Sequence, residues 1–114
     1  MKIKNTSILN EVAKCRASSL KDSTEKAPEE KGYYMMLLDR EVVYVGKSES
    51  GIRARLSSHY NGDKDVDTFS AQQIHENRDD LFVIWRIAQS DKVCVDMEKE
   101  WILRYDPLWN ERIG

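Results

Sequence analysis

Two short apolar runs, residues 33–38 and 42–45, are separated by a short polar break. Such a pair of runs is typical of a β-hairpin. The length of the hairpin loop decides where two tyrosines point, because successive side chains of a strand alternate between its faces. A three-residue loop at residues 38–40 would place Tyr34 opposite Tyr44 on one face, whereas a two-residue loop would send them to opposite faces.

The pattern after the hairpin predicts helices and one more strand. Apolar residues recur at helical spacing over residues 51–60 and 91–105, and a capping box at Ser70 opens another helix that ends near residue 77. The almost wholly apolar run 81–88 predicts a central strand covered on both faces. We therefore expect an α+β fold, in which the hairpin and this strand form a small three-stranded, mainly antiparallel sheet flanked by helices.

Residues 1–31 differ in character from the domain that we expect over residues 32–114. Residues 6–13 predict one short amphipathic helix, which packs either on the domain's own surface or against a protein partner. The following stretch, residues 17–31, is polar and charged and contains a proline, so we predict a flexible linker there.

The totals describe one domain with little net charge. The chain has 114 residues, of which 40% are hydrophobic and 33% charged, and its formal net charge is −2. No apolar run approaches membrane-spanning length and no signal-peptide core is present, so we predict a cytoplasmic protein without membrane association. The two cysteines fit no metal-ligand spacing and are expected to be free thiols. The acidic balance argues against nucleic acid, but cations at residues 47–60 predict a small basic cleft on an acidic surface.

Two polar residues of the helix at 51–60 have positions that suit a functional site. Arg55 and His59 are one helical turn apart at the edge of the apolar stripe, so both can face a cleft shared with the hairpin. Each also has a simpler interpretation as part of a solvated helix face. In the same way, Tyr34 and Tyr44 are good strand residues that can pack in a half-buried sheet.

Other polar residues have competing interpretations. Glu98 falls inside the apolar arc of the helix at 91–105, where a carboxylate is unfavourable unless a cation satisfies it. That cation is either a metal ion or the Arg or Lys of a buried ion pair. The acidic loop 61–67 resembles a calcium loop only in its alternating aspartates, so a solvated loop is favoured. His75 is interpreted as a surface or interface histidine.

The order of these residues resembles the GIY-YIG nuclease family. Gly32-Tyr33-Tyr34 matches the first signature, with Tyr33 where the family usually has an aliphatic residue, and Tyr44-Val45-Gly46 matches the second. The later polar positions of the family are matched by Arg55, His59, Glu98 and Asn110. Each short motif is weak alone, but six positions in order over residues 32–110 make a strong signal.

The resemblance implies a divalent-metal-dependent DNA endonuclease that hydrolyses phosphodiester bonds. Glu98 would bind one ion, Mg²⁺ or Mn²⁺, while Arg55 and Lys47 neutralise phosphate oxygens. Tyr34, with its pKa depressed by Lys47, would act as the general base or orient the water, and Tyr44 would orient the water or Tyr34.

The remaining positions have supporting roles in this hypothesis. His59 would shuttle a proton or bind phosphate, and Asn110 would fix local geometry through side-chain hydrogen bonds. DNA contacts are expected from Lys47, Arg53 and Arg55. One active site cuts one strand per encounter, so a homodimer would allow a double-strand break.

Two further questions stay open at this level. The small size of the chain favours a restriction, phage or toxin context over repair. The alternative function is a non-catalytic DNA-binding or protein-interaction module that has kept the nuclease fold, and RNA is a weaker alternative substrate.

Overall fold

The computed structural model describes residues 17–62 and 68–110, so the helix predicted at residues 6–13 lies outside the described residues. The elements in chain order are β1 (Ser18–Ser19), α2 (Leu20–Lys26), β2 (Gly32–Leu38), β3 (Glu41–Ser48), α3 (Ile52–Asn61), α4 (Phe69–Glu76), the 3-10 helix η1 (Arg78–Asp80), β4 (Phe82–Ile87) and α5 (Asp91–Tyr105). No helix in this part of the chain has both the length and the apolar character needed to cross a bilayer.

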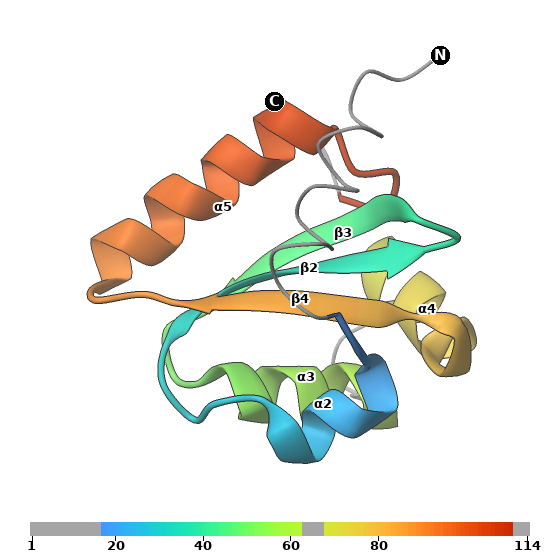
Figure 1. The fold of residues 1–114 in the computed structure, drawn as a ribbon. Helices are drawn as coiled ribbons and strands as arrows, with labels where there is room; N and C mark the ends of the chain where they lie inside the picture. Colours follow the sequence, from blue (N-terminus) through green and yellow to red (C-terminus); the bar gives the residue numbers. More distant parts are fainter. Residues whose placement is uncertain (1–16, 63–67, 111–114) are drawn as a thin grey trace.

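The four strands form one antiparallel sheet in the order β1-β4-β2-β3. The predicted α+β class is confirmed, with one strand more than expected, because the two-residue β1 pairs with β4. Helix α5 covers one face of the sheet, and α2 and α3 cover the other (Figure 1). Strand β3 therefore lies at an edge of the sheet, between the two helical layers.

The segment predicted to be a flexible linker is instead an ordered part of the domain. Leu20 at the start of α2 is completely buried. After α2, the backbone carbonyls of Pro28 and Glu30 accept hydrogen bonds from the amides of Arg53 (2.9 Å) and Ile52 (3.0 Å). These carbonyls satisfy free N–H groups in the first turn of α3. The prediction failed because main-chain capping leaves no trace in the apolar pattern of a polar segment.

The hairpin has a two-residue loop, Asp39-Arg40, and both residues have positive φ angles of 52° and 69°. Such a loop was expected to send Tyr34 and Tyr44 to opposite faces. The β2–β3 ladder, however, contains a register shift that leaves Val43 without a partner. This β-bulge adds one residue to β3 and so shifts the alternation of its side chains by one position. Tyr34 and Tyr44 therefore share the face covered by α3.

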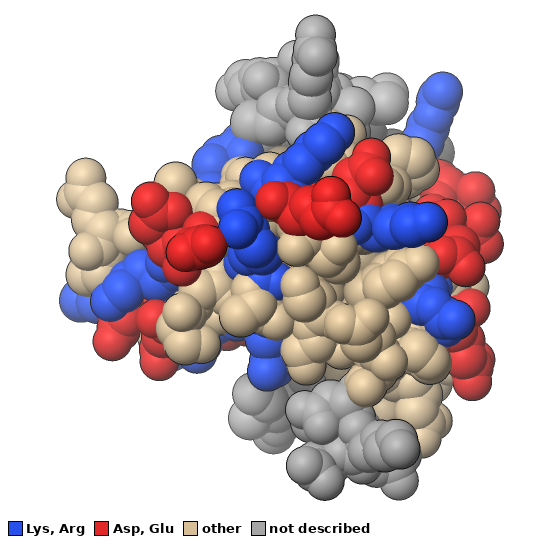
Figure 2. All heavy atoms as spheres, turned by 90° about the horizontal axis from the view of Figure 1, so that it is seen from below, with Lys and Arg blue, Asp and Glu red and all other residues tan. Residues whose placement is uncertain are grey.

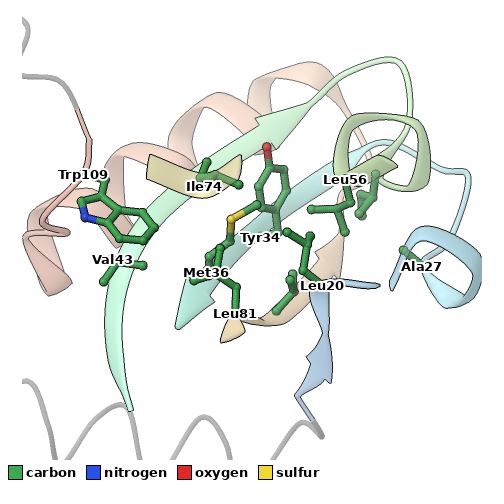
Figure 3. Packing of buried hydrophobic residues seen from close by; sticks show 11 residues of the cluster. Leu20, Ala27, Tyr34, Met36, Val43, Leu56, Ile74, Leu81 and Trp109 are labelled. Carbon is green, nitrogen blue, oxygen red and sulfur yellow. The ribbon is translucent and has the colours of Figure 1, made fainter. Parts of the chain in front are cut away.

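The sheet separates two hydrophobic clusters. The cluster beneath α5 contains Tyr33, Met35, Val45, Cys94 and Trp101. The second cluster lies between the sheet and the helices of the opposite face and includes Leu20, Tyr34, Met36, Leu56, Ile74 and Trp109. Figure 3 shows the Tyr34 ring among these residues, with its hydroxyl directed away from Met36.

Two local expectations need adjustment. Helix α4 begins one residue before the predicted capping box, because Thr68 is its N-cap and accepts a hydrogen bond from the Ala71 amide at 3.1 Å. Strand β4 is covered on both faces at Val83 and Ile84, which belong to opposite clusters. Its end is less protected than predicted, since Ile87 is 56% exposed.

Candidate active site

Gly46 allows the ring of Tyr34 to extend from the inner strand β2 across the edge strand β3. The two residues are partners in the ladder. A Cβ atom at Gly46 would lie 2.5 Å from the Tyr34 hydroxyl oxygen and 2.6 Å from the ring carbon that bears it. The ring therefore occupies the space that any side chain at Gly46 would fill. The phenol of an inner strand is in this way brought towards the edge of the sheet.

The hydroxyl of Tyr34 is held by two residues of α3. Its oxygen lies 2.9 Å from Nε2 of His59, and the Arg55 guanidinium also hydrogen-bonds to it. Because a guanidinium only donates, the Tyr34 oxygen accepts from Arg55 and its own proton points to His59. Burial raises the pKa of Tyr34 well above its ordinary value, and the nearby Tyr44 raises it further. The expected depression of this pKa by a cation is therefore wrong: desolvation of a completely buried phenol outweighs the attraction of Arg55.

His59 is neutral in this environment. Burial, with a smaller contribution from the Arg55 charge, lowers the pKa of His59 to about 4. The imidazole packs edge-on against both tyrosines, at centroid distances of 6.0 Å to Tyr34 and 5.6 Å to Tyr44. At neutral pH its Nε2 is therefore an acceptor for the Tyr34 proton.

Glu98 reaches the site from the other face of the sheet, because it is carried by α5. Burial raises the pKa of Glu98, while the charges of Lys47 and Arg55 lower it. The side chain of Lys47 lies on the α5 face, since it alternates with that of Gly46 along β3. Arg55 belongs to α3, on the opposite face of the sheet. Its charge nevertheless lowers the pKa of Glu98, so the two side chains lie near the same edge of the sheet, at β3. The site thus combines groups from both faces of the sheet.

Within residues 17–62 and 68–110, no side chain forms a hydrogen bond or ion pair with the Glu98 carboxylate. The alternative interpretation, a buried ion pair that holds the fold, therefore finds no support in this part of the chain. The same residues contain no group of three or more His, Cys, Asp or Glu side chains that could hold a metal ion. A metal in this site would depend on Glu98 and on water, which suits Mg²⁺ because this ion keeps several waters and needs few carboxylates.

The cations are more closely matched by acids than the sequence suggested. Lys47 lies 3.3 Å from the Glu49 carboxylate. Arg53 donates to the carbonyl of Ala27 at 2.7 Å and to Glu29 at 2.9 Å, so it ties α3 to the segment after α2. Figure 2 shows Lys and Arg side chains interspersed with Asp and Glu on the face formed by α2 and α3. This face is mixed in charge rather than acidic.

Asn110 completes the site by extending the sheet with its side chain. Its Oδ1 accepts from the amide of Val45 and its Nδ2 donates to the carbonyl of the same residue, both at 2.8 Å. The amide of Trp109 donates to the carbonyl of Val43 at 2.7 Å. The chain after α5 therefore fastens the outer edge of β3 and fixes the strand that carries Tyr44.

Comparison with known proteins identifies the family. The model of the UvrC-like GIY-YIG domain matches residues 30–111. The chain belongs to this family. Among curated proteins, the UvrABC system protein C of Anaeromyxobacter sp. (strain Fw109-5) is 34% identical over 98 residues, which cover 84% of this chain and 13% of that protein. The corresponding protein of Corynebacterium glutamicum (strain R) is 30% identical over 84 residues, covering 73% of this chain and 12% of that protein.

Solved structures show the same GIY-YIG fold. The N-terminal endonuclease domain of UvrC from Thermotoga maritima, a tyrosine point mutant bound to its catalytic divalent cation, superposes with a TM-score of 0.66 at 26% identity. This match covers 82% of the present chain and 96% of that one. An asparagine mutant of the same domain gives a TM-score of 0.65. These relatives are UvrC proteins, whereas the sequence alone favoured restriction or phage-type members.

The structure also explains the two glycines of the GIY-YIG signature, Gly32 and Gly46, whose role is not evident from the sequence. The close approach of Tyr34 requires Gly46. A Cβ at Gly32 would lie 2.1 Å from the carbonyl oxygen of Arg86 and 2.5 Å from Cδ1 of Ile52. The only available signal was the motif itself, since the clashes depend on neighbours distant in sequence.

The GIY-YIG domain brings most of the predicted site residues together. Tyr34, Arg55 and His59 are in direct contact, and Tyr44 packs on His59. Lys47 and Arg55 act electrostatically on Glu98, and Asn110 holds the strand between them. Arg53 is the exception, because its guanidinium is engaged with the segment after α2.

We predict that Gly46→Ala destabilises the domain by about 1–3 kcal/mol, because the added methyl group overlaps the Tyr34 ring. The free energy of unfolding from urea titration measures this loss. The same substitution in a Tyr34→Ala background should cost less than half as much, since its clashing partner is gone. Equal losses in the two backgrounds would contradict the proposed contact.

We also predict that acid weakens the fold through His59. The folded-state pKa of about 4 lies below the ordinary value of 6.5, so the unfolded chain binds the proton more readily between these pH values. Stability should therefore fall as pH drops from 6.5 to 4, by about 3 kcal/mol for this one group. Urea titrations across this range, run beside His59→Gln, measure it. A variant that loses stability as steeply as the wild type would show that His59 is not responsible.

Proposed function

We propose that this domain is a divalent-metal-dependent endonuclease that hydrolyses the phosphodiester bonds of DNA. The observation that carries the proposal is the arrangement around the β3 edge, where a carboxylate without a hydrogen-bonding partner in the described residues lies within electrostatic range of two cations. The hydrogen-bonded Tyr34–His59 pair lies on the other side of the same strand. The likeness to a UvrC endonuclease domain that binds a catalytic divalent cation supports the same activity.

We assign the metal-binding role to Glu98 and the metal to Mg²⁺, with Mn²⁺ as a substitute. Glu98 is partly buried, and no hydrogen bond from the described residues competes for it. When bound, the ion would stabilise negative charge on the phosphate and on the leaving oxygen. Every other function in the mechanism belongs to side chains of the chain itself.

Arg55 and Lys47 are the proposed phosphate-binding cations. Arg55 is exposed on α3, and its fork-shaped guanidinium suits a phosphate. Lys47 is 30% exposed and would exchange its contact with Glu49 for a phosphate oxygen. Arg53 is better described as a positioning residue, because it already bonds the segment that caps α3.

The burial of the two phenols suggests a division of roles that differs from our initial expectation. Tyr34 is completely buried and its raised pKa keeps it protonated, so we propose it as a positioning residue that orients His59 and Arg55. Tyr44 is only partly buried and can contact the attacking water. The one unprotonated nitrogen of neutral His59 accepts the Tyr34 proton, so we assign His59 to positioning Tyr44 by ring packing, and the proton lost by the water passes to Tyr44 as Tyr44 releases its own to solvent.

The expected product is a nicked strand, since each domain has one such site. A double-strand break would then require a homodimer or two separate events. The UvrC relatives are much longer than this chain. We therefore propose DNA as the class of substrate and go no further on the substrate in the cell.

We predict that Glu98→Gln lowers the rate of plasmid nicking in Mg²⁺ by about 100-fold or more, because the metal is lost together with several kcal/mol of charge stabilisation. Its melting temperature should stay at or above that of the wild type, since the carboxylate is partly desolvated. Glu100→Gln, an exposed acid on the same helix, is the matched control and should cleave normally.

The same assay separates the proposal from its alternatives. If wild type and Glu98→Gln leave DNA equally intact in both Mg²⁺ and Mn²⁺, the non-catalytic module is the better description. Cleavage of single-stranded RNA in a parallel incubation, without cleavage of DNA, would change the substrate class.

We predict that Tyr44→Phe lowers the single-turnover rate by about 100-fold or more with little change in DNA affinity, as expected for a group that acts on the water. Tyr34→Phe should lower the rate less, and it should also reduce stability, because the buried hydrogen bond to His59 is lost. Rates and unfolding free energies of both variants test this order. The assignment would be reversed if Tyr34→Phe were the slower enzyme and had normal stability.

A further inference from the structure

The main-chain groups on the outer edge of β3 form hydrogen bonds with the segment after α5 along only part of the strand, at Val43 and Val45, among the described residues. Both main-chain groups of Val45 bond to the Asn110 amide, so they point away from β2. In an antiparallel ladder, residues alternate between pairs that bond each other and pairs that do not. The Val45–Met35 pair is therefore one whose two residues do not hydrogen-bond to each other. The register is unbroken from this pair to Lys47–Tyr33, two residues further along, so the Lys47–Tyr33 pair is of the same kind.

It follows that the N–H and C=O groups of Lys47 also point outward from the sheet. The clamp formed by Trp109 and Asn110 occupies the edge at Val43 and Val45. Among the described residues, the main chain of Lys47 has no hydrogen-bond partner. One main-chain donor is thus presented at the edge where the groups of the candidate site meet.

Two cations and two acids surround this donor: the Lys47 ammonium lies 3.3 Å from Glu49, and the charges of Lys47, Arg55 and Glu49 all act on Glu98. A phosphate is favoured here once a cation occupies Glu98, as in the proposed function. Main-chain N–H groups are common partners of nucleic-acid phosphates and contribute position without adding charge. A second β-strand fits less well, because among residues 17–62 and 68–110 the clamp already occupies the edge at Val43 and Val45, and the Lys47 position alone is too short for strand pairing.

We propose that the main-chain N–H of Lys47 donates a hydrogen bond to a phosphate oxygen of the nucleic acid and positions its backbone at the site. This inference rests on the proposed nuclease function and adds a binding group to it. The residue would then hold phosphate in two ways, through its ammonium and through its amide. The two contributions differ physically, because only the ammonium displaces a counterion from the DNA.

That difference gives the experiment. In a Glu98→Gln background, fluorescence anisotropy measures the affinity for a short DNA duplex at several salt concentrations. Lys47→Ala removes the ammonium and should reduce the salt slope by about 1. Lys47→Pro removes the ammonium and the N–H, and proline is tolerated on an edge strand where the N–H faces outward. The Lys47→Pro variant should bind the DNA duplex at least about 5-fold more weakly than the Lys47→Ala variant does, and the two variants should have the same salt slope.

Ile87 supplies the matched control on β4. By the same alternation its N–H points away from β2, and its side chain is 56% exposed. Ile87→Ala and Ile87→Pro should therefore bind DNA alike. Circular dichroism checks that each proline variant is folded. If Lys47→Pro does not fold, replacement of the Lys47 amide by an ester removes the N–H alone and should give the same loss with an unchanged salt slope.

The outcomes separate this inference from the function on which it rests. If the wild type neither binds nor nicks DNA, both are overturned. If the wild type nicks DNA while Lys47→Pro, or the ester, binds as tightly as its N–H-bearing counterpart, the nuclease proposal stands and the role of the Lys47 amide is wrong. A loss of equal size in the Ile87 pair would attribute the effect to general strand damage.

Discussion

The passage of the Tyr34 ring over Gly46 is the contact on which the site depends. Without it, a side chain from the inner strand could not reach the edge of the sheet, and its hydroxyl could not meet the α3 residues that hold it. The space is available only because a glycine lies directly opposite in the ladder. The hydrogen bond between Tyr34 and His59, at 2.9 Å, then fixes α3 against this strand. The packing of Tyr34 of β2 against Gly46 of β3 thereby sets the position of His59 on α3.

Desolvation sets the protonation states of the same groups. Burial is the largest influence on Tyr34, His59 and Glu98 alike, and in each it favours the neutral form. For Tyr34 and His59 the neutral forms are complementary, since the phenol donates the proton that the imidazole accepts. For Glu98 the opposing charges of Lys47 and Arg55 limit the effect. The site thus combines one buried neutral pair with one acid close to two cations, and no residue in the described part of the chain forms an ion pair with that acid.

Much of this arrangement could be predicted from the sequence, because its strongest signals are local. The helix that carries Glu98 was predicted with the bounds that the structure has, and the acid was singled out by its place on the apolar face. What could not be predicted depends on contacts between distant segments. The bulge at Val43 reverses the consequence of the two-residue loop, and nothing in residues 38–41 indicates it. The order of residues 17–31 likewise arises from carbonyls that cap α3, a feature of the main chain alone.

The separation of Glu98 from Arg55 by an edge strand has a chemical consequence. A carboxylate and a guanidinium on one helical layer would form a bidentate pair, and both would then be lost to the substrate. Here the acid lies with α5 and the guanidinium with α3, so each lowers the electrostatic cost of the other without a direct bond in the described structure. The Glu98 carboxylate, which has no hydrogen bond or ion pair among the described residues, stays available to a cation. In the proposed function, a phosphate with its counter-cation would meet the carboxylate and the guanidinium together, because both lie next to the edge strand β3.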